Sequence, residues 1–319
     1  MEIVILDGYS LNPGDLSWQG IEALGHVTCY DRTSEEDIVE RCKAADIVLT
    51  NKVPFTRQTL QALPQLRLIC VMATGYNIID CEAARDAGVT VTNIPAYSTP
   101  SVVQMVFALL LSITNRVEHY THEVVAEERW TKSPDFCFWN TPLTELSGKR
   151  LGIVGLGRIG MGVARVAQAL GMEVVALTSK QQEDLPDGIQ KVDSDTLFRT
   201  ADVLSLHCPL TPETSDLVCR DTLRLMKPSA IVINTSRGPV VNEADMAEAL
   251  REDRLAAYGT DVLTREPAMA TNPLLRAPRV FITPHIAWAT LEARQRLMSI
   301  LEGNIKSYLE GAPINVVNP

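Results

Sequence analysis

The N-terminal part of the chain alternates between short apolar runs and segments whose apolar positions recur at helical spacing. The apolar runs, each typical of a buried strand, are Ile3–Leu6, Val27–Tyr30, Ile47–Thr50, Leu66–Met72 and Val89–Ile94. Between them lie helical patterns at Ser34–Lys43, Arg57–Ala62 and Asp80–Ala87. Strands that alternate with crossover helices form a parallel sheet, so this pattern predicts a complete small α/β domain.

The same alternation resumes in the second half of the chain and predicts a second doubly wound α/β domain. Its strand candidates are Leu151–Val154, Val174–Leu177, Val203–His207, Ile231–Thr235, Tyr258–Val262 and Val280–Thr283. Six strands are the number expected for two mononucleotide-binding halves. The helical pattern Leu291–Leu309 closes the chain without a strand of its own, so we expect this helix to return to the first domain.

The segment between the two sets of strands begins as a helix and continues as less regular sequence. Thr99 suits an N-cap with Pro100 at the first helical position, and the helix should run through the apolar stretch Val102–Ile113. From residue 116 to 148 the sequence is mixed. Its aromatic residues are Trp130, Phe136, Phe138 and Trp139. Aromatic side chains in such a segment indicate packing either against a second subunit or over the rest of this chain.

A glycine-rich turn follows the first strand of the second domain. The strand ends in Gly155-Leu156-Gly157-Arg158-Ile159-Gly160, and an Ala- and Val-rich helical pattern follows. Gly155 can adopt backbone angles that a side chain forbids, Gly157 lets a pyrophosphate approach, and Gly160 lets the helix pack close to the strand. The N–H groups of the first helical turn can then bind an anion. A tight turn without a ligand is the alternative, but the strand–turn–helix–strand context predicts dinucleotide binding.

Polar residues that could carry out chemistry follow the later strands. Arg237 presents a permanently charged fork suited to a carboxylate, and His285 can give or take a proton near neutral pH. Glu266, if it contacts His285, would orient the ring and stabilise its charged form. Ligands of parallel α/β sheets bind at the carboxyl ends of strands, so these side chains beside a nicotinamide would suit reduction of a 2-keto acid. Each of them alone could instead be structural.

Composition and charge exclude several other classes of protein. The 319 residues are 46% hydrophobic and 21% charged, with a net charge of −10 and no basic run, so we expect no nucleic-acid partner. The stretch Val102–Ile113 is too short to span a bilayer, and we expect no signal peptide and no membrane association. The seven cysteines form no C-x-x-C pair, and His119 and His122 have no third ligand nearby. We therefore expect no metal site and no disulfide framework, which favours the cytoplasm.

The ordered motifs of the chain resemble those of the D-isomer-specific 2-hydroxyacid dehydrogenase family over essentially its whole length. The motifs are the glycine loop 155–160, His207-Cys208-Pro209-Leu210-Thr211-Pro212-Glu213-Thr214, Ile233-Asn234-Thr235-Ser236-Arg237-Gly238, Asp261-Val262 with Glu266-Pro267, and Thr283-Pro284-His285-Ile286-Ala287. The resemblance implies a Rossmann cofactor domain at 99–288, inserted into a flavodoxin-like substrate domain made of 1–98 and 289–319, with the active site in the cleft between them. It also implies a homodimer formed through an arm at about 116–148.

Residue roles follow from the same resemblance. It implies that Arg237 binds the substrate carboxylate and polarises the carbonyl, that His285 is the acid–base group, and that Glu266 is its partner. NAD(P)H would be the cofactor, with Asp261 holding its nicotinamide carboxamide. The other implied cofactor contacts are Gly155, Gly157, Arg158, Ile159, Gly160, Thr178, Ser179, Lys180, His207, Cys208, Pro209, Thr214, Thr235, Ser236 and Ala287. The other implied substrate contacts are Ala73, Thr74, Gly75 and Trp288, with the N–H groups of Thr74 and Gly75 on the carboxylate.

Two segments, 94–102 and 285–289, are most similar to the glycerate dehydrogenase, or hydroxypyruvate reductase, branch of the family. This similarity implies reduction of hydroxypyruvate to D-glycerate and of glyoxylate to glycolate, with Trp288 as a wall of a pocket for a short, polar substrate. Two positions depart from the family pattern. Gln104 stands where many relatives have Glu, and Thr178-Ser179-Lys180 stands where NAD-preferring relatives place an acid that binds the ribose 2′-hydroxyl. Without that acid we expect NADPH to be accepted and favoured.

Other functions stay open at this point. The same chemistry could act on D-lactate, a branched 2-keto acid or phosphoglycerate, although no basic cluster beyond Arg237 suits a phosphate ester. A dinucleotide-sensing binding protein, like the corepressors that share this fold, keeps the same Arg, Glu and His. The lack of extra peptide- or DNA-binding segments disfavours such a sensor. Formate-type oxidation is disfavoured because the predicted site serves both a carboxylate and a carbonyl.

Overall fold

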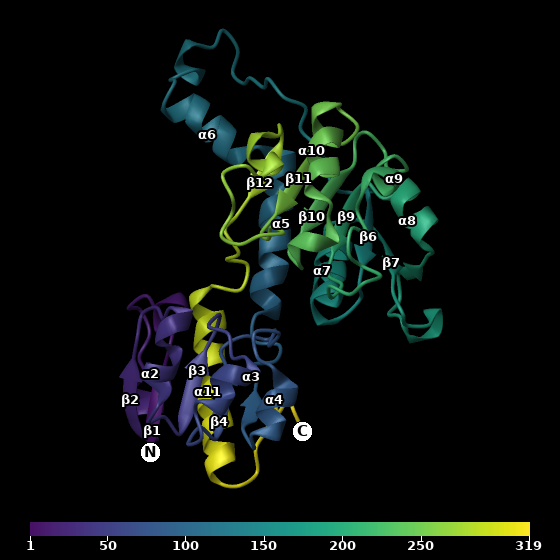
Figure 1. The fold of residues 1–319 in the computed structure, drawn as a ribbon. Helices are drawn as coiled ribbons and strands as arrows, with labels where there is room; N and C mark the ends of the chain where they lie inside the picture. The colour runs from purple at the N-terminus through teal and green to yellow at the C-terminus, as the bar shows by residue number, and fades with distance from the viewer. The chain divides into compact units, whose positions relative to one another are not determined.

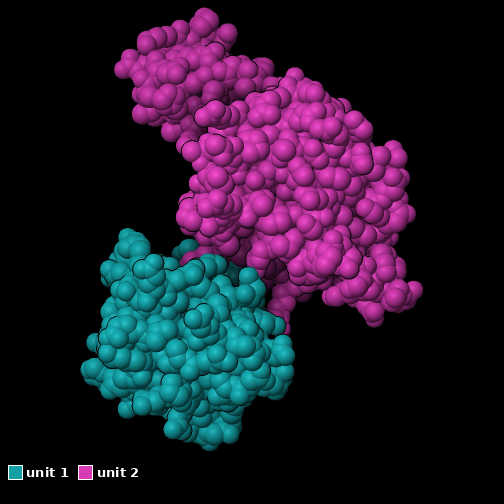
Figure 2. All heavy atoms as spheres, viewed as in Figure 1, with its two compact units in different colours: residues 1–98, 289–319 teal, residues 99–288 magenta.

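The computed structural model describes residues 1–319, which divide into two compact units (Figure 2). Unit 1 is Met1–Ser98 with Ala289–Pro319, and unit 2 is Thr99–Trp288. Each unit is built on one parallel β-sheet with helices on its faces (Figure 1). The predicted fold class, two doubly wound parallel-sheet domains, is confirmed.

The sheet of unit 1 has the strand order β2-β1-β3-β4-β5, which is the flavodoxin-like order. Its strands are β1 (Glu2–Ile5), β2 (His26–Cys29), β3 (Ile47–Thr50), β4 (Leu68–Val71) and β5 (Thr90–Thr92). Its helices are α1 (Gln19–Glu22), α2 (Ile38–Cys42), α3 (Arg57–Gln61), α4 (Cys81–Asp86) and α11 (Leu291–Leu309). Every residue of β3 and β4 is buried, as expected for central parallel strands that are covered on both faces.

The last helix, α11, joins unit 1 although it comes from the other end of the chain. The Thr290 side chain caps it by accepting a hydrogen bond from the N–H of Ala293. Ala293, Leu297 and Leu301 recur every four residues and are fully buried. This spacing gives the helix one apolar face, and the helix packs against β4 of the first sheet.

The sheet of unit 2 has seven strands in the order β12-β11-β10-β9-β6-β7-β8. The strands are β6 (Arg150–Val154), β7 (Glu173–Leu177), β8 (Ile189–Lys191), β9 (Val203–Leu206), β10 (Ile231–Asn234), β11 (Ala257–Thr260) and β12 (Val280–Ile282). The helices packed in this unit are α5 (Thr99–Asn115), α7 (Arg158–Ala169), α8 (Ser194–Thr200), α9 (Arg220–Leu223) and α10 (Glu243–Arg251).

Short 3₁₀ turns occur in both units. In unit 1 they lie at Gly8–Ser10 and Glu35–Asp37, and in unit 2 at Trp130–Lys132, Gln182–Asp184, Gly238–Val240 and Pro273–Arg276.

Two sequence-based expectations for unit 2 need correction. The six expected strands omitted β8, because Gln190 is exposed and only Ile189 of its three residues is buried, so no apolar run marks it. Thr99 is the first residue of α5 rather than the residue before the helix. Neither change alters the order of the strands that carry the candidate site.

The segment 116–148 contains a helix that the mixed sequence did not predict. Helix α6 (Val117–Val125) and the loop after it stand away from the sheet of unit 2 (Figure 1). The apolar ends of this helix, Val117 and Val125, are exposed, so the sequence shows no pattern that faces a core. Glu123 is buried and fixes the loop by accepting hydrogen bonds from Arg129 and Asn140.

No single helix has both the length and the apolar composition that a membrane crossing needs. Helices α5 and α6 meet that requirement only together, and they are bent by 54° at the break between them.

Candidate active site

The glycine loop lies where the strand order of unit 2 reverses, between β6 and β9. Gly155 has a φ of +89°, and a Cβ atom there would lie 2.7 Å from the backbone nitrogen of Cys208. A Cβ on Gly160 would lie 2.3 Å from the carbonyl oxygen of Gly155, so α7 packs directly on the turn. Glycine is therefore required at both positions. In parallel α/β sheets, such a reversal is where ligands bind.

The same loop leaves open backbone at the start of α7. Gly157 is the N-cap of this 12-residue helix, and nothing lies within 4 Å of the position that its Cβ would take. The N–H groups of Arg158 and Ile159 in the first helical turn are thus at an end suited to a phosphate. After β10, the Oγ1 atom of Thr235 is buried without a hydrogen-bond partner. Open backbone at a helix N-terminus and an unpaired buried hydroxyl both fit a bound dinucleotide.

The turn after β7 carries no acidic side chain at the predicted ribose-binding positions. The hydroxyl of Thr178 accepts a hydrogen bond from the N–H of Lys180 at 3.3 Å. Ser179 and Lys180 are exposed, and Lys180 makes no ion pair. The turn therefore presents two hydroxyl groups and an ammonium group that makes no ion pair. These side chains can bind the 2′-phosphate of NADPH, whereas an acidic side chain at this turn would repel it.

The loop after β9 contains a histidine, His207, whose pKa is lowered. His207 Nε2 lies 2.8 Å from the hydroxyl of Ser205, which is fully buried. Burial lowers the pKa of His207 to about 3. Thr214 closes the loop by donating to the carbonyl of Pro209 at 2.7 Å and accepting from the N–H of Thr211 at 2.8 Å. Cys208, 7% exposed, lies against Gly155.

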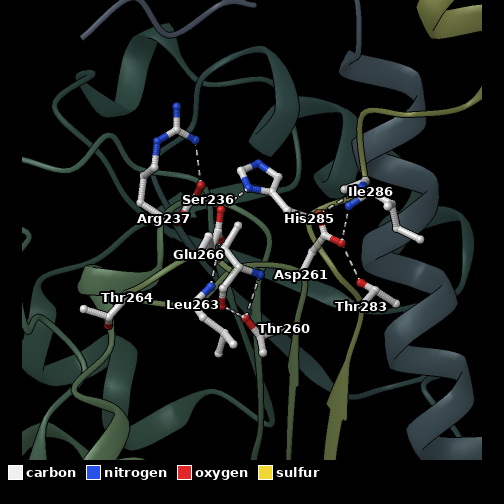
Figure 3. Close-up of polar contacts among 12 residues, drawn as sticks. Ser236, Arg237, Thr260, Asp261, Leu263, Thr264, Glu266, Thr283, His285 and Ile286 are labelled. Carbon is white, nitrogen blue, oxygen red and sulfur yellow. Dashed lines mark hydrogen bonds and ion pairs between the residues drawn. The ribbon is translucent and has the colours of Figure 1, made fainter. Parts of the chain in front are cut away.

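Arg237 leaves the sheet edge directly after β10. Asn234 shapes this turn, because its Oδ1 accepts from the N–H of Ser236 and its Nδ2 donates to the carbonyl of Arg237. The Arg237 guanidinium is exposed, donates to the Ser236 carbonyl at 2.8 Å and makes no ion pair (Figure 3). A free guanidinium of this kind can bind a carboxylate through two parallel hydrogen bonds.

His285 and Glu266 come from consecutive strand ends and meet. His285 Nδ1 lies 2.6 Å from Glu266 Oε2 (Figure 3). The other carboxylate oxygen, Oε1, accepts from the N–H of Leu263 at 3.0 Å, so the backbone holds Glu266 in place. The contact occupies Nδ1 and leaves Nε2 as the ring nitrogen that can exchange a proton with a ligand. The imidazole and the carboxylate are about one-third exposed, at 32% and 36%.

Asp261 supports the turn that carries His285. Its carboxylate accepts from the Thr283 hydroxyl at 2.5 Å and from the N–H groups of Ile286 and Ala287 at 2.9 and 2.8 Å (Figure 3). Burial raises the pKa of Asp261, while these hydrogen bonds act in the opposite direction. His285 has a φ of +56°, and these bonds hold that left-handed turn. The role expected of Asp261 toward a nicotinamide carboxamide stays a prediction.

The remaining predicted residues follow strands of both sheets: β4 in unit 1 and β12 in unit 2. In unit 1, Ala73 follows β4, and the Thr74 hydroxyl donates to the carbonyl of Ile94 at 2.7 Å. The backbone N–H groups of Thr74 and Gly75 make no hydrogen bond within the chain. In unit 2, the carbonyl of Ala287 accepts from the Ser101 hydroxyl, which ties this turn to α5, and half-buried Trp288 follows it.

His119 and His122 are separate from all of these residues. His119 Nε2 lies 3.0 Å from Asn140 Oδ1, and His122 Nε2 lies 3.6 Å from a carboxylate oxygen of Glu127. No group of three or more metal-ligating side chains occurs in the chain.

Two contributors to the site were not assigned a role from the sequence. Thr283 donates to Asp261, and Asn234 shapes the Arg237 turn. Both residues belong to the motifs that end β12 and β10, so their positions at strand ends could have indicated a role in the site. Their contacts depend on the geometry of tight turns, which a single sequence does not reveal.

Comparison with known proteins identifies the family. The profile described as "D-isomer specific 2-hydroxyacid dehydrogenase, NAD binding domain" matches residues 107–287. The chain belongs to the D-isomer specific 2-hydroxyacid dehydrogenase family. It is 47% identical over 322 residues to a hydroxypyruvate reductase of Blautia hydrogenotrophica, with all of both chains covered. It is 40% identical to a glycerate dehydrogenase of Methylorubrum extorquens, with 90% of each chain covered.

A solved structure extends this comparison from sequence to three-dimensional fold. An acyclic imino acid reductase in complex with NADPH and D-Arg is 30% identical, with a TM-score of 0.84 and coverage of 99% of this chain and 100% of that one. This D-2-hydroxyacid dehydrogenase is thus an oxidoreductase of the CH–OH group that uses a nicotinamide dinucleotide. The predicted family, and its glycerate dehydrogenase or hydroxypyruvate reductase branch, are confirmed.

Proposed function

We propose that this chain reduces hydroxypyruvate to D-glycerate and glyoxylate to glycolate, reversibly, with NADPH as the preferred reductant. The observation that carries the proposal is the 2.6 Å contact between His285 and Glu266 at the sheet edge that also bears the unpaired Arg237. An acid–base group and a carboxylate-binding cation are the side chains that reduction of a 2-keto acid requires. The name of the 47% identical relative, a hydroxypyruvate reductase, supports the substrate.

Each residue has a defined task in this proposal. Arg237 binds the substrate carboxylate and polarises the keto group, with Thr74 and Gly75 donating backbone N–H groups to the same carboxylate. The dinucleotide that the loop 155–160 would hold would supply the hydride that C2 accepts. His285 donates its Nε2 proton to the carbonyl oxygen, so a 2-keto acid, a hydride and a proton give the 2-hydroxy acid. Glu266 stabilises the protonated ring before transfer, and in the oxidative direction His285 takes the proton back.

The preference for NADPH rests on the turn after β7. The 2′-phosphate of NADPH would meet the hydroxyls of Thr178 and Ser179 and the ammonium group of Lys180, with no carboxylate among these residues to repel it. Arg158, Ile159, Thr235 and Ser236 complete the proposed cofactor contacts, together with the three glycines and the residues 207–209 and 214. In this proposal Asp261 would hold the nicotinamide carboxamide and also anchors the 285–287 turn. Ala287 and Trp288 border the reactive end.

The proposed assembly is a homodimer formed through the arm at 116–148. Phe136, Trp139 and Trp130 of this segment are 90%, 68% and 53% exposed. Large aromatic groups left in water at one site favour a protein partner, and a second copy of the arm would cover them. The seven free cysteines support a reducing compartment, the cytoplasm.

Turnover with a panel of acids tests the proposal. The loss of NADPH and NADH absorbance is followed with hydroxypyruvate, glyoxylate, pyruvate and a phosphorylated keto acid. We expect the highest kcat/KM with hydroxypyruvate and NADPH, and little activity with the phosphorylated acid. Tight NADH binding without turnover of any acid would instead indicate a dinucleotide sensor and would overturn the proposal.

A further inference from the structure

A cation at the carboxyl edge of the unit 1 sheet has no partner in the chain. Lys52 follows β3, is exposed, and makes neither an ion pair nor a side-chain hydrogen bond. Its neighbours in sequence, Asn51 and Val53, are each only 6% exposed. A single exposed side chain between two buried ones must leave the loop toward solvent or a ligand.

The backbone of this cation is unusually well fixed for a loop residue. Asp7, which follows β1, accepts hydrogen bonds from the N–H of Asn51 at 2.9 Å and from the N–H of Lys52 at 2.6 Å. Thr50 accepts from the N–H of Val53 at 3.1 Å. Asp7 is itself 7% exposed, and burial raises its pKa while the positive charge of Lys52 acts to lower it. The buried carboxylate of Asp7 thus fixes the backbone of Lys52, whose ammonium group is exposed.

The position in the sheet is the one at which such folds bind ligands. The strand order β2-β1-β3-β4-β5 reverses between β1 and β3, and Asp7 and Lys52 lie at the carboxyl ends of these two strands. Strand β4 lies directly beside β3, with Thr50 opposite Val71. Lys52 follows β3 and Ala73 follows β4, so Lys52 and the turn of Thr74 and Gly75 leave the same edge of the sheet from neighbouring strands.

We propose that Lys52 is a substrate-binding residue whose ammonium group binds the carboxylate of the 2-keto acid, beside the N–H groups of Thr74 and Gly75. The inference rests on the proposed function, which supplies the carboxylate. The N–H groups of that turn make no hydrogen bond within the chain, and the ammonium group makes no ion pair, so donors of one kind meet at one sheet edge. An ammonium group adds charge that neutral backbone donors cannot supply.

The test compares Lys52→Gln, Lys52→Arg and a matched control, Lys43→Gln. Lys43 lies before β3, toward its amino end, whereas Lys52 follows the strand, and Lys43 pairs with Glu40. For Lys52→Gln we expect KM to rise about tenfold for hydroxypyruvate, glyoxylate and pyruvate alike, with kcat within about twofold of the wild type. Lys52→Arg should lie between the wild type and Lys52→Gln, and Lys43→Gln should match the wild type.

Two results would overturn the inference. Unchanged KM values in Lys52→Gln would mean that the side chain only faces solvent. A rise in KM for hydroxypyruvate alone would assign Lys52 to the 3-hydroxyl group instead of the carboxylate.

Binding of oxamate, a carboxylate that cannot be reduced, separates this inference from the proposed function. Its Kd is measured by fluorescence with each NADPH-loaded protein, and we expect Lys52→Gln to bind about tenfold more weakly. If the wild type turned over no acid, the proposed function would fail, while the oxamate Kd values would still decide for or against Lys52. Equal Kd values in wild type and Lys52→Gln would reject it.

Discussion

Glu266 holds His285 through a 2.6 Å contact between Oε2 and Nδ1, across 19 residues of sequence. The carboxylate is itself held by the backbone N–H of Leu263, and the turn of His285 is held by Asp261. Both supports come from the loop after β11, whereas the imidazole follows β12. The loop after β11 therefore orients the imidazole that follows β12.

Replacing Glu266 with Gln should slow reduction without preventing cofactor binding. The amide cannot stabilise the protonated imidazole as a carboxylate does, so we expect kcat for hydroxypyruvate to fall about tenfold to a hundredfold. Steady-state rates with hydroxypyruvate at neutral pH measure the effect, with Glu248→Gln, a surface ion-pair residue, as the control. A wild-type kcat in Glu266→Gln would show that Glu266 does not act through the ring.

Introducing an acid after β7 should reverse the cofactor preference. In Thr178→Asp the new carboxylate would repel the 2′-phosphate of NADPH and could accept a hydrogen bond from the 2′-hydroxyl of NADH. We expect the ratio of kcat/KM for NADPH to that for NADH to fall at least about tenfold, which corresponds to about 1.4 kcal/mol. Lys180→Gln should lower the same ratio less, because it removes an attraction without adding a repulsion. A ratio that does not change in Thr178→Asp would place the ribose elsewhere.

Polar substitutions on the arm should break the proposed dimer. Phe136→Asp combined with Trp139→Asp places two charges where exposed aromatic groups now stand. We expect a shift from dimer to monomer in light scattering coupled to size exclusion, at micromolar protein. Leu309→Asp is the control, because Leu309 is a 44% exposed apolar residue at the end of α11, outside the arm. A wild-type monomer, or a variant that stays dimeric, would contradict the proposed interface.

His207 should make the fold less stable in acid. Burial lowers its pKa to about 3, whereas an unfolded histidine has a pKa near 6.5. Between these values the unfolded chain binds a proton that the folded chain does not, so stability present above pH 6.5 is lost as the pH falls. The loss from this residue is about 1.4 kcal/mol for each pH unit.

Urea unfolding of the cofactor-free protein at pH 7.5, 6, 5 and 4.5 measures this effect. The glutamine of His207→Gln cannot take up the proton. As the pH is lowered, the free energy of unfolding of this variant should therefore fall less steeply than that of the wild type. Parallel curves for the two proteins would show that His207 titrates normally in the folded chain.

The sequence was most informative where residue type and local pattern coincide. Apolar runs located every central strand, because those strands are buried on both faces. The edge strand β8 has no such run and was missed. The role expected of Glu266 depended on a contact with His285, and that contact is present because neighbouring parallel strands end at the same edge.

The parts that the sequence did not reveal depend on geometry after the strands end. Asp261 accepts hydrogen bonds from the N–H groups of Ile286 and Ala287 at a turn in which His285 has a positive φ. The residue types at this turn do not predict that backbone conformation. Likewise, Lys52 looks like an ordinary surface lysine in the sequence, and only the pairing of β3 with β4 puts it at the same sheet edge as the turn of Thr74 and Gly75. Helix α6 escaped prediction because it turns its apolar ends outward.

The role of His285 as proton donor is the central claim, and His285→Gln tests it most directly. Glutamine has similar size but cannot donate a proton in the reaction. Single-turnover oxidation of bound NADPH by saturating hydroxypyruvate is compared in the two proteins, with the NADPH Kd measured by fluorescence. We predict a rate at least about a hundredfold lower in the variant, with an unchanged Kd. A variant that reduces hydroxypyruvate at nearly the wild-type rate would contradict the account.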